Sequence, residues 1–182
     1  MIRFATILVT LTALSAGPIT VRNFHTVDER VLRGGQPSEK EFEELSKLSV
    51  KTVIDLRAGV DRSEKTIVEK LGIRYIHEPM SAIAEPSSQQ ISKILQLLET
   101  EPGPVYVHCL RGKDRTGTVI ACYRIAHNKW GNQKALDEAR GFGMSRLEWR
   151  MQQFIRQFKP TPKNQYPIPP PAAPGGNAAL AW

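Results

Sequence analysis

At 182 residues, the chain has the length of a single domain that buries a core without covalent staples. Two cysteines, Cys109 and Cys122, are too few for a disulfide framework. A formal net charge of +7 at pH 7 favours an anionic partner such as a phosphate ester, although a solvated basic surface would carry the same charge. We expect no nucleic-acid partner, because no stripe of aromatic and basic residues accompanies the charge.

Both ends of the chain differ from its middle. Residues 1–17 have a basic start, an apolar run over 4–14 and then small residues, a pattern typical of a secretory signal peptide or an N-terminal anchor. We therefore expect a protein that is exported (periplasmic or secreted) or held near a membrane by this segment, and a cytoplasmic one if the segment is no signal. Residues 161–182 are rich in Pro, Ala and Gly and predict a disordered tail, which leaves 18–160 as the domain.

Strand and helix patterns alternate between these ends. An extended pair is expected over 21–35, followed by a helix that begins at Ser38, where Ser38 and Glu41 have the spacing of a capping box. Further strands are expected at 51–57, 73–77 and 105–108, and further helices at 63–72, 90–100, 133–140 and 146–158, with one more carrying the apolar residues of 119–125. This alternation predicts an α/β fold with a central, mostly parallel sheet flanked by helices.

The segment VHCLRGKDRTG, residues 107–117, is a tight loop between a strand and a helix. A helix N-terminus offers free N–H groups and the positive end of the helix dipole, which favour an anion. Gly112 permits the turn that points successive amides inward. Five residues separate Cys109 from Arg115, so the loop can surround one tetrahedral oxyanion, with the thiol at its floor and the guanidinium closing over it. The expected phosphate-binding residues are Leu110, Arg111, Gly112, Lys113, Asp114 and Arg115.

The cations of this loop also act on Cys109. Thiolate is the nucleophilic form of cysteine, and cations and a helix N-terminus favour it. The Thr116 hydroxyl could donate a hydrogen bond to the sulfur when it leaves phosphorus. His108 could order the loop through backbone contacts, or it could be an ordinary core histidine.

HCLRGKDRTG resembles the His-Cys-x5-Arg-Ser/Thr-Gly signature of the cysteine-dependent protein tyrosine phosphatase superfamily. The upstream segments RVLRGGQPS, KTVIDLR and GIRYIHEPM resemble its compact bacterial dual-specificity phosphatase-like branch, and the resemblance covers residues 22–158. It implies attack by Cys109 on a phosphomonoester, a phospho-cysteine intermediate bound by Arg115 and the loop amides, and then hydrolysis. It implies no cofactor and no metal. We expect a monomer.

One residue of the family pattern is missing. Relatives place a general-acid aspartate on the loop that follows the strand at 73–77, and matching the two sequences puts Ala82 there. The only acids of this loop are Glu78 and Glu85. We favour Asp114 as the general acid, because some bacterial relatives with a Gly-Lys-Asp-Arg loop use the loop aspartate. Glu85 is the alternative, and Asp114 could instead pair with a neighbouring loop cation and only shape the loop.

Two further residues invite a chemical role. Asp55 follows a buried strand and is expected to be a structural acceptor for nearby N–H groups or for Arg57. Cys122 is expected to pack as a small hydrophobic residue in its helix, with a role as resolving thiol for Cys109 as the alternative.

The substrate is less constrained than the reaction. Arg111 and Lys113 add positive charge beyond that of Arg115, which would suit a polyanion. We favour a phosphomonoester hydrolase acting on phosphotyrosine or with dual specificity on phosphorylated proteins. The alternatives are an inositol phosphate or phosphoinositide phosphatase and a non-catalytic phosphate-binding module.

Overall fold

The computed structural model of the chain describes residues 19–59 and 61–160. The expected leader at 1–17 and the expected tail at 161–182 lie outside the described residues. Within the described part, no helix combines the length and the apolar character that crossing a membrane requires.

Five strands form one sheet in the order β1-β2-β5-β3-β4. They are β1 (His25–Thr26), β2 (Val31–Gly34), β3 (Thr52–Asp55), β4 (Arg74–His77) and β5 (Val105–His108). Neighbouring strands run parallel except β1 and β2, which form an antiparallel pair at one edge. The predicted mostly parallel sheet and the predicted extended pair at its start are both confirmed.

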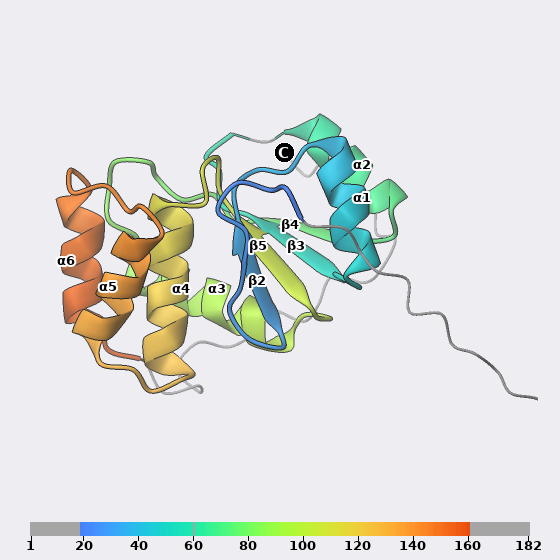
Figure 1. The fold of residues 1–182 in the computed structure, drawn as a ribbon. Coiled ribbons are helices and arrows are strands. Elements are labelled where there is room, and N and C mark those ends of the chain that lie inside the picture. Colours follow the sequence, from blue (N-terminus) through green and yellow to red (C-terminus); the bar gives the residue numbers. More distant parts are fainter. Residues whose placement is uncertain (1–18, 60, 161–182) are drawn as a thin grey trace, which may run out of the picture.

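Helices cover both faces of this sheet (Figure 1). They are α1 (Glu39–Lys47), α2 (Arg62–Lys70), α3 (Ser88–Thr100), α4 (Asp114–Ala126), α5 (Asn132–Gly141) and α6 (Trp149–Gln157). Because side chains alternate along a strand, Val105 and Val107 of β5 pack with the apolar residues of α3–α6, whereas Tyr106 packs with those of α1 and α2. The predicted α/β fold is therefore confirmed.

α4 is the central helix on the face of the sheet that α3–α6 cover. Its residues 116–125 are all buried, and it packs against α3, α5 and α6. It follows β5, another fully buried element, after only five residues. The connecting loop 109–113 is therefore held at both ends by the most buried parts of the molecule.

Side chains fix where two of the helices begin. α1 starts with the predicted capping box: the Ser38 hydroxyl accepts from the Glu41 N–H, and the Glu41 carboxylate accepts from the Ser38 N–H at 2.7 Å. The last helix, expected from residue 146, begins only at Trp149. Two hydrogen bonds explain the late start. The Ser145 N–H donates to Asp114, and the Ser145 hydroxyl accepts from the Leu147 N–H, so this segment is held in a turn.

The register of the sheet aligns the carboxyl ends of four strands. Gly34 of β2, His108 of β5, Asp55 of β3 and His77 of β4 lie side by side in one row. In open α/β sheets, ligands bind beyond the carboxyl ends of the strands. The row therefore places the Cys109 loop at the edge where a ligand site is expected.

Candidate active site

The loop 109–113 begins with a buried thiol. Cys109 directly follows β5, and only 3% of its surface is exposed. Leu110 and Arg111 are exposed, whereas Gly112 is buried against the end of β2. The sulfur thus lies at the base of the loop, with the cationic side chain of Arg111 at its rim.

Three successive carbonyl groups of the loop are bound by the segment that surrounds β2. The carbonyl of Leu110 accepts from the Gln36 N–H at 3.3 Å, and that of Arg111 accepts from the Asn23 side-chain amide at 3.1 Å. The carbonyl of Gly112 accepts from the Arg33 guanidinium at 2.7 Å. All three oxygens therefore face the N-terminal part of the chain, away from any ligand of the loop.

The N–H groups of the same peptides face the opposite way. A trans peptide is planar, with its N–H and C=O antiparallel, so binding the carbonyls of residues 110–112 directs the N–H groups of residues 111–113 to the open side. Among the described residues these N–H groups have no acceptor. They converge at the N-terminus of α4, where the helix dipole adds a positive partial charge. The predicted anion cradle has the expected construction.

Gly112 is required by this geometry. Its φ is +68°, and a Cβ atom there would lie 2.4 Å from the carbonyl carbon of Gly34. No side chain fits between the loop and the end of β2, and residues with a Cβ atom rarely adopt this backbone conformation.

Arg115 and Thr116 occupy the first turn of α4. The Arg115 guanidinium is half-buried and donates one hydrogen bond, 3.3 Å long, to the carbonyl of Leu56 just beyond β3. This contact orients the side chain across the carboxyl edge and leaves most of its N–H groups available for a ligand. The Thr116 hydroxyl is buried and has no partner among the described residues, so it is available to a nearby sulfur or phosphate.

Asp114 and Lys113 connect the loop to the segment between α5 and α6. Asp114 Oδ1 accepts from the Ser145 N–H at 2.8 Å. The methylene groups of Lys113 lie against Gly143, whose φ of +86° lets the backbone come close. Glu85, the other candidate acid, is exposed on the segment between β4 and α3 and has no hydrogen bond or ion pair with described residues.

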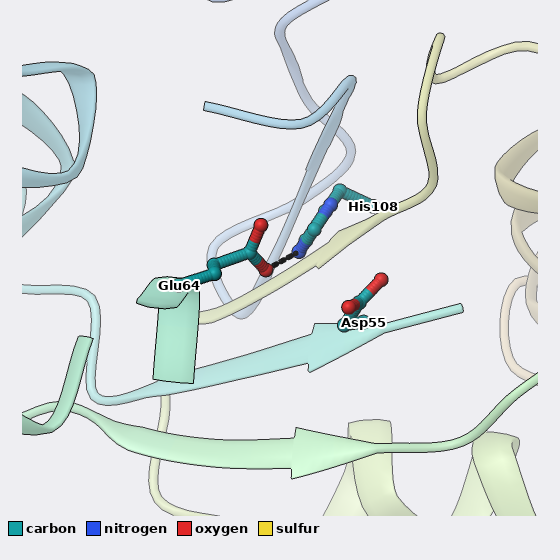
Figure 2. A group of neighbouring side chains, drawn as sticks. All are labelled: Asp55, Glu64 and His108. Atoms are coloured by element: carbon teal, nitrogen blue, oxygen red, sulfur yellow. Dashed lines mark ion pairs between the residues drawn. The ribbon is translucent and has the colours of Figure 1, made fainter. Parts of the chain in front are cut away.

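His108 lies below the loop, facing a buried carboxylate (Figure 2). Its Nε2 is 3.1 Å from Glu64 Oε1, and both side chains are buried. The ring stacks on Tyr106 at 5.6 Å and meets Phe42 edge-on. Apart from this contact with Glu64, neither ring nitrogen binds a backbone group of the described residues, which favours the second alternative, a core histidine. The ring instead fills a polar core position between the sheet and α2.

Arg57 joins Glu64 to Asp55. Its guanidinium donates to Asp55 Oδ2 and to Glu64 Oε2, each at 2.7 Å, and Tyr75 donates its hydroxyl to Asp55 at 2.8 Å. Burial raises the pKa of Asp55, but the hydrogen bonds from Arg57 and the positive field of His108 outweigh it and leave the pKa below its ordinary value. Asp55 is therefore the structural acceptor that the sequence predicted.

Asp55, Glu64 and His108 are also the one cluster of the described residues whose ligand atoms lie close enough to hold a metal, all within 4.8 Å of one another. The carboxylates are already bound by the Arg57 guanidinium, which occupies the position that a cation would need. The cluster fits an internal ion-pair network and not a metal centre.

Cys122 lies in the middle of α4 and is fully buried. Burial raises the pKa of its thiol well above the ordinary value, which disfavours the nucleophilic thiolate form. This agrees with packing as a small hydrophobic residue and gives no support to a resolving role.

Sequence reasoning did not single out the donors that shape the loop, Asn23, Arg33 and Gln36, or the partner of His108, Glu64. A signal was present for Arg33, which interrupts the apolar strand pattern VLRG with a charge. The register that brings the end of β2 under the loop was not visible in the chain itself.

Comparison with known proteins agrees with this geometry. A model of the tyrosine phosphatase family matches residues 18–169. The chain belongs to the tyrosine phosphatase family. It is 34% identical over 143 residues to the probable tyrosine-protein phosphatase DG1060 of Dictyostelium discoideum, covering 75% of this chain and 85% of that protein.

Two solved structures are similar in both fold and sequence. The core catalytic domain of the PP-IP phosphatase SIW14 from S. cerevisiae, in complex with citrate, has a TM-score of 0.69 and 28% identity, covering 76% of this phosphatase and 86% of that chain. A variant of TpbA from P. aeruginosa in complex with pTyr has a TM-score of 0.66 and 25% identity, covering 74% and 83%. The molecule is a cysteine-dependent phosphatase. Since these relatives come from eukaryotes and a bacterium, the bacterial branch stays a prediction.

Proposed function

We propose that this phosphatase hydrolyses phosphomonoesters of phosphorylated proteins, phosphotyrosine among them, with Cys109 as the nucleophile. One observation carries the proposal. The buried Cys109 thiol lies at the base of a loop whose carbonyls at 110–112 are all bound from behind, so that its N–H groups are free for a phosphoryl group.

The chemistry proceeds in two steps. The Cys109 thiolate attacks phosphorus, an S–P bond forms as the P–O ester bond breaks, and the leaving oxygen takes a proton from a general acid. Water then attacks phosphorus and gives a proton to the carboxylate that the general acid has become. The S–P bond breaks, and inorganic phosphate and the thiolate are released. Arg115 and the loop amides hold the equatorial oxygens in both steps, and the unpartnered Thr116 hydroxyl donates to the departing sulfur.

Asp114 is the proposed general acid. It lies in the first turn of α4 next to Arg115. Its Oδ1 accepts from the Ser145 N–H, and its Oδ2 has no partner in the part of the chain that the structure describes. Asp114→Asn keeps an oxygen for the Ser145 N–H but removes the acidic proton. We expect turnover to fall by about 10²-fold for a phenyl phosphate with a poor leaving group and far less for p-nitrophenyl phosphate. Glu85→Gln is the matched control, and a larger loss there for poor leaving groups would transfer the role to Glu85.

A second candidate substrate class is favoured by the rim of the site. The Arg111 guanidinium is exposed and has no ion-pair partner among the described residues, and the half-buried Lys113 lies beside it. Such cations suit a molecule with several phosphates better than a single phosphotyrosine. The relatives are divided in the same way, since SIW14 is a PP-IP phosphatase and TpbA is a dual specificity protein phosphatase.

Phosphate release from a small panel tests these proposals. The panel holds a phosphotyrosine peptide, a phosphoserine peptide, a phosphoinositide and inositol hexakisphosphate, with Cys109→Ser as the blank and Cys122→Ala as the cysteine control. Release from the peptides that is lost only in Cys109→Ser supports the main proposal, and release confined to the inositol compounds supports the second. Turnover by Cys109→Ser equal to that of the wild type would disprove the proposed nucleophile.

A further inference from the structure

A second arginine lies under the loop, on the side away from the ligand. Arg33 is in β2, and its side chain has no exposed surface. Among the described residues it forms no ion pair with a carboxylate. Buried guanidinium groups are normally paired, because transfer of a lone charge out of water is unfavourable. An unpaired arginine in the core therefore requires an explanation.

The contacts of Arg33 point to the loop. Nη2 donates to the carbonyl of Gly112 at 2.7 Å, and the guanidinium carbon lies 4.2 Å from the centre of the Phe142 ring. Nε and Nη1 are buried, and neither has a hydrogen-bond partner within residues 19–59 and 61–160. The carbonyl bond also orients the rest of that peptide, so Arg33 indirectly directs the Lys113 N–H into the anion cradle.

The charged groups around Arg33 leave few counter-charges. Burial lowers its pKa to about 10, while Glu138 of α5, Cys109 and Tyr106 of β5 raise it and Arg124 of α4 lowers it further. Arg33 remains a cation at neutral pH. Glu138 already forms an ion pair with Arg124 at 2.9 Å, and a neutral Tyr106 carries no charge. Cys109 begins the same loop that Arg33 binds at the Gly112 carbonyl, so its thiolate is the remaining anion near Arg33.

We infer that Arg33 is a positioning residue of the phosphatase reaction, a buried cation that fixes the Gly112 peptide and balances the charge of the Cys109 thiolate from behind the loop. The inference deepens the proposed function and rests on Cys109 being the nucleophile. It assigns two cations to the thiolate, with Arg115 on the ligand side and Arg33 on the core side. His108, which precedes Cys109, faces Glu64 instead.

Three substitutions separate charge from shape. Arg33→Lys keeps the charge, Arg33→Gln keeps a donor for the Gly112 carbonyl without the charge, and Arg33→Met removes both. Thermal unfolding identifies any variant that does not fold. If Arg33→Met does not fold, the comparison of Arg33→Gln with Arg33→Lys still isolates the effect of the charge.

The main measurement is the rate at which iodoacetamide alkylates Cys109 as a function of pH in the full-length chain. It needs no substrate. We expect the midpoint to move to higher pH by about one unit in Arg33→Gln and Arg33→Met and to stay near that of the wild type in Arg33→Lys. In parallel, kcat for p-nitrophenyl phosphate at pH 6 should fall about tenfold in the two uncharged variants.

Two results would overturn the inference. An unchanged alkylation midpoint in Arg33→Gln would reduce Arg33 to a structural hydrogen-bond donor. An equal shift in all three variants would show that the shape of the side chain, and not its charge, acts on Cys109. Failure of the proposed function is recognised separately, because the wild type would then release no phosphate although its Cys109 is alkylated.

Discussion

Two arginines, the half-buried Arg57 and the buried Arg33, lie near the carboxyl edge of the sheet, and their partners are of opposite kinds. Arg57, just beyond β3, binds Asp55 and Glu64 at 2.7 Å each and Asp61 at 3.4 Å. Arg33, in β2, has no carboxylate partner among the described residues and binds only the carbonyl of Gly112 and the face of an aromatic ring. Carboxylates neutralise the guanidinium of Arg57, whereas no carboxylate of the described residues neutralises that of Arg33.

This difference indicates that the charge of Arg57 serves the fold, whereas the charge of Arg33 serves the reaction. Burial lowers the pKa of Arg57, but the hydrogen bonds and charges of Asp55 and Glu64 outweigh it and raise the pKa above its ordinary value. Burial lowers the pKa of Arg33 to about 10, with no ion pair to offset it. Charges that neutralise one another stabilise the fold locally. A buried cation that no carboxylate neutralises favours a nearby anion, which the inference identifies as the Cys109 thiolate.

The largest effect is expected from separating the loop from β2. In Gly112→Ala the new Cβ would lie 2.4 Å from the Gly34 backbone, and the φ of +68° is unfavourable for alanine. The loop must shift and the bond to Arg33 is lost, so turnover of p-nitrophenyl phosphate should fall by about 10²-fold or more. Gly131→Ala is the control, since a Cβ there meets nothing within 4 Å. Comparable activity of the two variants would contradict the close packing of loop and strand.

Removing the paired arginine should act on stability first. Arg57→Met leaves the buried carboxylates of Asp55 and Glu64 without their cation, and the free energy of unfolding should fall by about 3–5 kcal/mol. Urea unfolding at pH 7 measures this loss. Arg62→Met, at an exposed position at the start of α2, should change stability by less than about 0.5 kcal/mol. Equal losses in both variants would show that the ion-pair network contributes little.

The pH dependence of stability measures what the charge of Asp55 contributes to this ion-pair network. Because the folded pKa of Asp55 lies below its unfolded value, the ionised carboxylate contributes stability that is fully present above about pH 4 and is lost as pH falls through the folded pKa. Asp55→Asn should therefore be about 1–3 kcal/mol less stable than the wild type at pH 7, with a difference that shrinks below pH ~4.

Protonation of Asp61 changes the stability of the wild type and of Asp55→Asn in the same direction, so its contribution cancels in the difference between the two proteins. Its pKa is lowered to about 2, first by the Ser63 hydroxyl and then by the Glu64 N–H. Urea unfolding of wild type and Asp55→Asn at pH 7, 5, 4 and 3 gives the difference directly. A difference that stays constant from pH 7 to pH 3 would mean that Asp55 acts through its shape and not through its charge.

The sequence predicted most of the fold and the centre of the site, and the reasons for its failures are physical. The strand at 105–108 and the capping box at Ser38 depend on local patterns, which the structure retains. The role of Arg33 depends on the parallel register of β2 and β5. This register pairs Gly34 with His108, two residues that are far apart in sequence and that no local pattern links. The late start of α6 depends likewise on a distant partner, Asp114.

The smallest effect is expected at the rim, where the exposed Arg111 guanidinium forms no ion pair with any described residue. Arg111→Ala should leave stability within about 0.5 kcal/mol of the wild type and kcat for p-nitrophenyl phosphate unchanged, because the side chain is exposed and outside the anion cradle. If the substrate carries several phosphates, KM should rise several-fold, and the rise should disappear in high salt, since an exposed charge acts on such a ligand through a screened field. Lys40→Ala removes another exposed charge, from α1, and serves as the control.

A rise in KM for inositol hexakisphosphate in Arg111→Ala alone would make Arg111 a specificity residue. Equal rises in both variants would assign the effect to the net charge of the protein, and an unchanged KM would leave phosphorylated proteins as the favoured substrates.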